Sequence, residues 1–307
     1  MPADPPDPVA PVARAAVLAA AAELLAAAGV AAAPTSLEAL LAVPGLQTEQ
    51  FAFSDPLSDR GLPVPLARAQ ADLRPQVRGM VDVPEQVIYT HRGLGDTQRR
   101  FVTLHELGHF VLPWHATLLQ TCSEQDLSPA ARRTWEREAN LFAGACLFQG
   151  AAFTAAARGG RFGWASVRRL AARYAASLEA TARQFVISRP EPALLLVATL
   201  RPTLAQARTA ASGEPLLEVR YAAGSPAWYR TAGREALPAP GTPLSWAHPA
   251  TRVLLATRAG TLVTPLAGPL DDRAGPPLAA ELLSNGHDVL LLGQLADGGV
   301  SSPKGAG

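Results

Sequence analysis

The fold is decided by a stretch that reads TQRRFVTLHELGHFV, residues 97–111. Apolar side chains recur in it at helical spacing, which predicts an α-helix that begins near Thr97 and ends at about Val111. Pro113 follows closely, and a proline cannot continue a helix. The apolar residues make this a helix of the core: Phe101, Val102, Leu104, Phe110 and Val111.

Two histidines on this helix, His105 and His109, lie four residues apart. That spacing places them about 40° apart around the axis and one turn apart along it, so both imidazoles can bind one ion. Glu106 is turned away by about 100°, which suits it poorly as a third ligand and well as the base that takes a proton from an attacking water. Polar groups on a buried helix need partners, and a metal ion supplies them. The His-Glu-x-x-His pattern therefore predicts a zinc-type metallopeptidase site, with Glu106 as general base and zinc, or else manganese, as the metal.

A third protein ligand is required, and His115 is one candidate. It stands where a metzincin places its third histidine. That pattern also has a glycine three residues after the second histidine and a methionine downstream. Here the glycine position is Leu112, and the only methionines are Met1 and Met80. The pattern therefore favours a ligand other than His115.

The other candidates lie on a second helix, predicted from the Ser128-Pro129 pair to about Gln149. Glu136 borders the apolar face of this helix, and Asn140 shares its face one turn on. We choose Glu136 as the third ligand and expect Asn140 to bond a ligand histidine and fix its tautomer. Glu138 is turned about 200° from Glu136, is expected to face solvent, and is the reserve ligand. Without the upstream histidines, both glutamates would be interpreted as part of a solvated charge run.

Two segments resemble the ImmA/IrrE metallopeptidase family: QRRFVTLHELGH at residues 98–109 and EREANLFA at residues 136–143. The resemblance implies an α+β protein with a zincin-like metallopeptidase domain, a helix-turn-helix-like region and a C-terminal GAF-like sheet domain. It also implies a function, because family members of this layout cleave a helix-turn-helix transcriptional repressor, DdrO, and so release genes of the DNA-damage and radiation response. One departure is Pro113, where many relatives continue with Leu-His.

Composition shifts along the chain indicate five segments. They are a flexible N-terminus at 1–11, a domain with the two-histidine helix at 12–150, a helical region at 151–190, a sheet-based domain at 191–295 and a flexible tail at 296–307. The resemblance implies that these three middle segments are the metallopeptidase domain, the helix-turn-helix-like region and the GAF-like sensor domain.

Within the peptidase domain we expect an Ala-rich helix that ends near Gly29, a short helix capped by Ser36, and a loop at 55–65. The expected strands are Val77–Val83 and Val87–Tyr89, followed in the last domain by Leu194–Leu200, Leu216–Tyr221, Val253–Thr257, Thr261–Leu266 and Val289–Leu295.

The region between these domains is basic. Helices are expected at Trp164–Tyr174 and Leu178–Val186, and between Arg158 and Arg189 there are seven arginines and one acidic residue, Glu179. A helix, a short turn and a second helix form the layout of a helix-turn-helix unit. The region is therefore a candidate surface for DNA or for the repressor. The alternative is a packed helical hairpin whose arginines are merely solvated.

The composition of the whole chain excludes several classes of protein. Its 307 residues carry a net charge of +1, which gives no overall attraction to nucleic acid or to an acidic membrane. Ala15–Ala33 is too rich in alanine for a membrane span, and Met1–Pro8 lacks the basic residue of a secretory leader. The two cysteines, Cys122 and Cys146, are too few for a disulfide scaffold and are expected to be reduced thiols. We therefore expect a cytoplasmic protein.

Two questions stay open at this level. The rival to a regulatory protease is a DNA-binding transcriptional regulator with a structural metal site, although a closed site of four protein ligands has no use for Glu106 as a base. The group that stabilises the oxyanion is also undetermined, with Tyr89, His91 and Tyr174 as candidates on chemistry alone. In the last domain the GAF resemblance suggests a pocket for a small-molecule signal. The polar and aromatic residues there are expected to be core and loop residues: Trp228, Tyr229, Trp246, His248 and His287.

Overall fold

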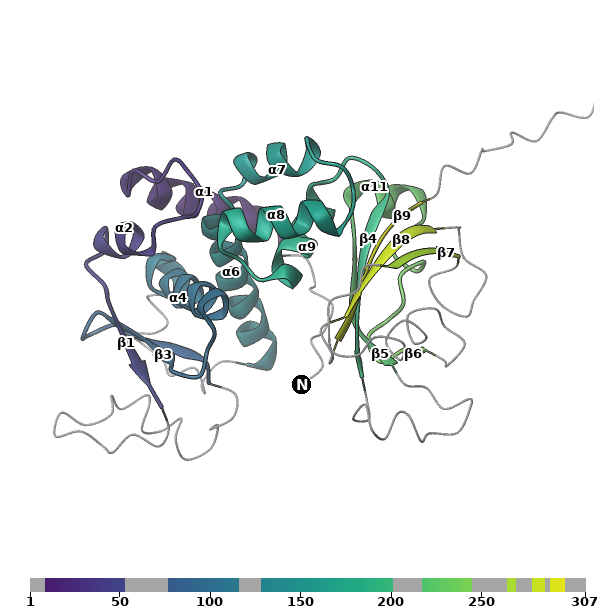
Figure 1. Ribbon diagram of the computed structural model, residues 1–307. Coiled ribbons are helices and arrows are strands. Elements are labelled where there is room, and N and C mark those ends of the chain that lie inside the picture. Colours follow the sequence, from purple (N-terminus) through teal and green to yellow (C-terminus); the bar gives the residue numbers. More distant parts are fainter. Residues whose placement is uncertain are drawn as a thin grey trace, which may run out of the picture. The chain divides into compact units, whose positions relative to one another are not determined.

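A computed structural model describes residues 9–52, 77–115, 128–200, 217–244, 264–268, 278–284 and 288–295 (Figure 1). These residues mix helices and sheets, which confirms the α+β class. They form two compact units. One contains Pro8–Phe153 with Ala171–Ser177, and the other contains the described residues of Thr154–Leu170 and Leu178–Gly307. Residues 1–8 of the expected N-terminal segment 1–11, the expected tail 296–307, the loop at 55–65 and the strand at 253–257 lie outside the described residues, as do Cys122, Trp246, His248 and His287. Helix α1 begins at Pro11, the last residue of the expected N-terminal segment.

The first unit is built on a small sheet. Its elements are α1 (Pro11–Ala27), α2 (Leu37–Ala42), β1 (Gln47–Phe51), β2 (Gly79–Asp82), β3 (Val87–His91), α4 (Asp96–Val111) and α6 (Pro129–Phe148). The strands lie in the order β1-β3-β2, with β1 parallel and β2 antiparallel to β3. The predicted helices and the strands β2 and β3 are confirmed, as is the cap by Ser36, whose Oγ accepts a hydrogen bond from the Ala39 amide. β1 was not predicted from the sequence, because four of its five residues are polar and exposed.

The helix that carries the histidines packs between this sheet and α6. α4 contacts β2 and β3 on one side and α6 on the other (Figure 1). Gly108 allows the close approach, because a Cβ there would lie 3.0 Å from Cδ1 of Phe142 on α6. Phe142 is completely buried, so the contact belongs to the core. The glycine of the motif therefore brings the second helix near enough to place a side chain over the histidines.

Helices continue after α6. They are α7 (Ala151–Arg158), α8 (Trp164–Tyr174) and α9 (Leu178–Ser188). α8 and α9 confirm the two helices expected there. α7 was missed, because alanine-rich sequence continues across the break. The chain turns at Gln149 and Gly150, both of which have positive φ.

The second unit contains a six-stranded sheet of order β6-β5-β4-β9-β8-β7, in which every pairing is antiparallel. Its elements after α9 are β4 (Ala193–Leu200), β5 (Leu217–Gly224), α11 (Pro226–Thr231), β6 (Pro243–Leu244), β7 (Thr264–Gly268), β8 (Leu278–Ser284) and β9 (Asp288–Leu295). Residues 193–198 of β4 are all buried, and α9 and α11 both pack against this strand. Trp228 of α11 lies in the core, as expected, whereas Tyr229 is partly exposed.

One of the seven arginines does not contribute to a basic surface. Arg189 is buried and donates to the carbonyl oxygens of Ala157 and Gly160 while it pairs with Glu191. Arg158 donates to the Ser188 carbonyl. The other six are exposed: Arg158, Arg161, Arg168, Arg169, Arg173 and Arg183. The helix-turn-helix and GAF-like assignments, and the domain boundaries drawn from them, stay predictions.

None of the helices in the described ranges is by itself both long enough and apolar enough to span a membrane. Taken together, α6 and α7 have the length and the apolar composition of a membrane span, but the two helices are bent by 64° relative to each other.

Candidate metal centre

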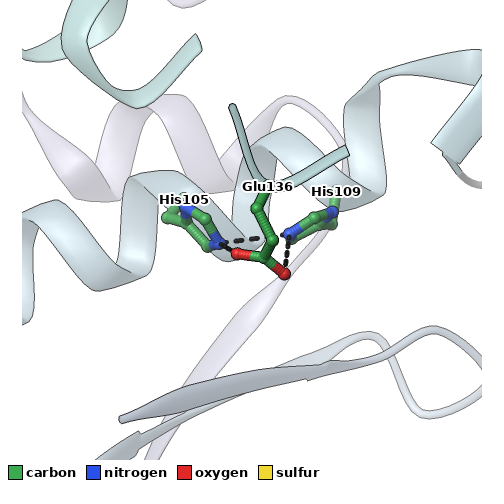
Figure 2. Close-up of side chains that lie close together, drawn as sticks. All are labelled: His105, His109 and Glu136. Atoms are coloured by element: carbon green, nitrogen blue, oxygen red, sulfur yellow. Dashed lines mark hydrogen bonds and ion pairs between the residues drawn. The ribbon is translucent and has the colours of Figure 1, made fainter. Parts of the chain in front are cut away.

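α4 presents its two histidines side by side on one face. The Nε2 atoms of His105 and His109 are 3.1 Å apart, and the rings meet edge to face with centroids separated by 4.8 Å (Figure 2). His109 is buried, whereas His105 is partly exposed. The pair is thus open to solvent on the His105 side and enclosed on the His109 side.

Glu136 reaches the same point from α6. Its Oε2 lies 3.2 Å from Nε2 of His105, and its Oε1 lies 3.9 Å from Nε2 of His109 (Figure 2). One ligand atom from each of the three residues falls within 4.8 Å of the others. Two imidazoles and one carboxylate are a donor set that zinc accepts in catalytic sites, where the remaining position stays open. Among the described residues, no fourth ligand joins this group.

The pKa values of Glu136 and the two histidines are shifted by burial and by one another. Burial acts to raise the pKa of Glu136, but the hydrogen bond and charge of His105, followed by the charge of His109, hold it below its ordinary value. Burial acts to lower the pKa of His105, but Glu136 and then Glu106 outweigh it and raise that pKa. Burial, followed by the charge of His105, lowers the pKa of His109 to about 3. His109 is therefore a neutral imidazole, the form that binds a metal ion.

The Nδ1 atom of each histidine, on the far side of the ring from Glu136, also has a partner. Nδ1 of His105 lies 3.1 Å from the Asn140 side-chain oxygen, which confirms the expected contact. Nδ1 of His109 lies 3.1 Å from Nδ1 of His115. The other ring nitrogen of His115, Nε2, lies 2.9 Å from Glu138, so both nitrogens of His115 have partners outside the group of His105 Nε2, His109 Nε2 and Glu136.

The expected exposure of Glu138 is wrong. The side chain is only 8% exposed, and its Oε2 accepts a hydrogen bond from Nε1 of Trp114 at 2.7 Å. Glu136 is the more exposed of the two, at 43%. The angular argument correctly separated the two glutamates around the helix. It failed on exposure, because the chain after α4 turns back and covers the face that carries Glu138.

Glu106 lies between the histidines and the sheet. Its charge contributes to the raised pKa of His105. Its Oε1 would be 3.0 Å from a Cβ built on Gly79 of β2. The predicted general base therefore faces β2, which among the described strands pairs only with β3.

Gly79 makes this approach of β2 to α4 sterically feasible. Replacing Gly79 with alanine would make its Cβ overlap Cγ1 of Val102, so we expect the free energy of unfolding to fall by about 1–3 kcal/mol. Urea unfolding measures the change, and Val102→Ala in the same chain is expected to restore part of the loss. A Gly79→Ala protein as stable as the unchanged protein would contradict this packing.

None of the three oxyanion candidates faces this centre. Gly79 pairs with Thr90 and faces α4, so strand alternation turns the neighbouring residues of β3, Tyr89 and His91, to the opposite face of the sheet. Tyr174 is buried against Phe148, the last residue of α6, about 18 Å along the helix from Glu136.

A two-histidine helix, a glutamate from the next helix and a strand at the edge of the described part of the sheet are typical of a metallopeptidase-type domain. Residues 65–185 match the family model Peptidase_M78, described as the IrrE N-terminal-like domain. The match supports the ImmA/IrrE family for this part of the chain. A solved structure of a Mycobacterium tuberculosis transcriptional regulator has a similar fold, with a TM-score of 0.52 and 15% sequence identity, over 92% of this chain and 76% of that one. No curated protein matches the sequence.

Proposed function

We propose that this chain is a site-specific metallopeptidase that acts on a transcriptional regulator. The observation that carries the proposal is the convergence of His105, His109 and Glu136 within 4.8 Å, with Glu106 beside them and facing an edge strand. A structural site would have no use for a second carboxylate, that of Glu106, beside the three ligands. We assign the peptidase domain to residues 12–150.

The residues present fit a zinc ion, with manganese as the second choice. A bound metal of this kind supplies Lewis acidity, which polarises the scissile carbonyl and acidifies the attacking water. His105, His109 and Glu136 would hold it. Glu106 takes the proton from the attacking water on its carboxylate and passes it to the leaving amine.

The position of β2 supports a peptide substrate. An edge strand has unpaired amide and carbonyl groups that can bind an extended peptide as an additional strand. Such a peptide would run along β2 past Gly79, beside the carboxylate of Glu106. Backbone recognition of this kind leaves side-chain selectivity to other parts of the chain.

For the substrate we propose a helix-turn-helix repressor of the DdrO type, which this chain cleaves in the cytoplasm. Deinococcus IrrE cleaves such a repressor in the DNA-damage and radiation response. The IrrE N-terminal-like match at residues 65–185 supports the substrate class. We further propose that the helix-turn-helix-like region at 151–190 docks the repressor or DNA through its exposed arginines, and that the sheet domain at 191–295 is GAF-like and senses a small-molecule signal. The antiparallel sheet and the exposed arginines support these two roles.

The test is incubation of the purified chain with a candidate helix-turn-helix repressor, with added zinc or manganese, or with a chelator. We expect one discrete cut with metal and none with chelator, read on a denaturing gel and located by mass spectrometry. Binding of operator DNA by the chain, with no cut under any metal, would instead support the DNA-binding regulator with a structural metal site.

A further inference from the structure

The hydrogen bond on the enclosed side of the centre joins two imidazoles. Nδ1 of His109 lies 3.1 Å from Nδ1 of His115, and Nε2 of His115 lies 2.9 Å from Oε2 of Glu138. His115 is completely buried, and His109 and Glu138 are each 6% exposed. These three residues form a chain that starts at the metal centre and ends at a buried carboxylate, which we call the His109–His115–Glu138 chain.

The proton positions in this chain depend on one another. A histidine that binds a metal through Nε2 has its lone pair there, so its proton is on Nδ1. Nδ1 of His109 then donates, and Nδ1 of His115 must accept. The single proton of His115 is therefore on Nε2, where it points at Glu138, and a carboxylate can only accept.

We propose that His115 and Glu138 are positioning residues that hold His109 in the tautomer whose Nε2 binds the metal. The proposal rests on the metal role proposed above. Glu138 is the last residue of the His109–His115–Glu138 chain. Its carboxylate accepts the hydrogen bond of His115 and so keeps the His115 proton on Nε2. Nδ1 of His115 is then unprotonated and accepts from Nδ1 of His109. Without an acceptor at Glu138, His115 would gain by placing its proton on Nδ1, which would force His109 to carry its own proton on Nε2.

The surrounding side chains hold the rings in the required orientation. The Trp135 ring lies against both imidazoles, with centroids 4.7 Å from His109 and 4.9 Å from His115. Trp114 donates to the same Oε2 atom of Glu138 that His115 contacts. The partner of His105, in contrast, is an exposed Asn140 that is open to water. Water can therefore replace Asn140 as the hydrogen-bond partner of His105, but it cannot replace the buried His115 as the partner of His109.

The first measurement is the tautomer state of the metal-free full chain, by 15N–1H NMR of protein labelled on histidine. The expected result is a proton on Nδ1 of His109 and on Nε2 of His115. A proton on Nδ1 of His115, or on Nε2 of His109, would overturn the proposal even if no variant folded.

The second measurement is the zinc affinity of three variants, by competition with a chromophoric chelator. Glu138→Leu removes the acceptor, and we expect affinity to fall roughly 10–100-fold, as for other partners of metal ligands, with the His115 proton moving to Nδ1. Glu138→Gln keeps an acceptor oxygen and should stay within a few-fold of the unchanged protein. Trp114→Phe, the matched control, removes the other donor to Glu138 and should also have little effect.

The outcomes separate this proposal from the metal role. Unchanged zinc affinity and unchanged tautomers in Glu138→Leu would overturn the positioning role and leave the metal site intact. If the unchanged protein binds neither zinc nor manganese, the metal role is wrong. The NMR spectrum would still show whether the protons of the His109–His115–Glu138 chain lie on Nδ1 of His109 and Nε2 of His115. An equal loss of affinity in Trp114→Phe and Glu138→Leu, with no change of tautomer, would indicate packing alone and would also overturn the proposal.

Discussion

Replacing Glu106 with glutamine is expected to abolish peptide cleavage while zinc still binds with unchanged affinity. Glutamine has nearly the shape of glutamate but cannot accept a proton from the attacking water. Loss of a positioned general base lowers rates by about 10²- to 10⁴-fold. Glu106 does not belong to the group of converging ligand atoms, so the metal should be held as before.

Single-turnover cleavage of the repressor, with zinc titrated in parallel, measures both effects. Glu49→Gln is the matched control, because it makes the same chemical change at an exposed position of β1 in the same unit. The control should cleave at the unchanged rate. If Glu106→Gln cleaves as fast as its parent, Glu106 is not the base, and the structural-metal alternative gains support.

Replacing Glu136 with glutamine is expected to have the largest effect on metal binding. The change removes the negative charge that lies 3.2 Å from His105 and 3.9 Å from His109, and it puts a neutral amide where an anionic ligand is needed. Loss of an outer partner of a metal ligand costs roughly 10–100-fold in affinity, and loss of a ligand itself should cost more. Cleavage should fall in proportion to the metal that is lost.

Competition with a chelator measures this affinity directly, and the Glu106→Gln protein is the comparison. The two glutamines should dissociate the two functions: one protein binds metal without cleaving, and the other loses metal and cleavage together. Equal zinc affinity in both variants would show that Glu136 is not a ligand and would direct the search to side chains outside the described ranges.

The local part of the centre was predictable because a helix converts sequence spacing into geometry. Four residues correspond to just over one turn, so the proximity of His105 and His109 required no knowledge of the rest of the fold. Asn140 followed by the same rule, since it shares a helix face with Glu136. The strands β2 and β3 were found from their apolar residues, and β1 was missed because its exposed polar residues have no such pattern.

The enclosed side of the centre could not be predicted in the same way. No periodicity links His115 to Glu138, because His115 follows the end of α4 at Leu112, whereas Glu138 belongs to a different helix, α6. A helical rule therefore described Glu138 as solvent-facing, although it is buried under Trp114 and His115. A histidine six residues after the motif, followed by a second glutamate near the chosen ligand, was the only available signal, and it did not specify a contact.

The sequence by itself determined the helix, its two histidines and its glutamate, because these depend on interactions within a few residues of each other. Only the tertiary structure decided which glutamate meets the histidines, which one lies behind them, and which strand faces Glu106. Those choices depend on how closely α4, α6 and the sheet pack, and two glycines without side chains, Gly79 and Gly108, permit that packing. Packing distances between elements far apart in the chain are not encoded in the period of any one of them.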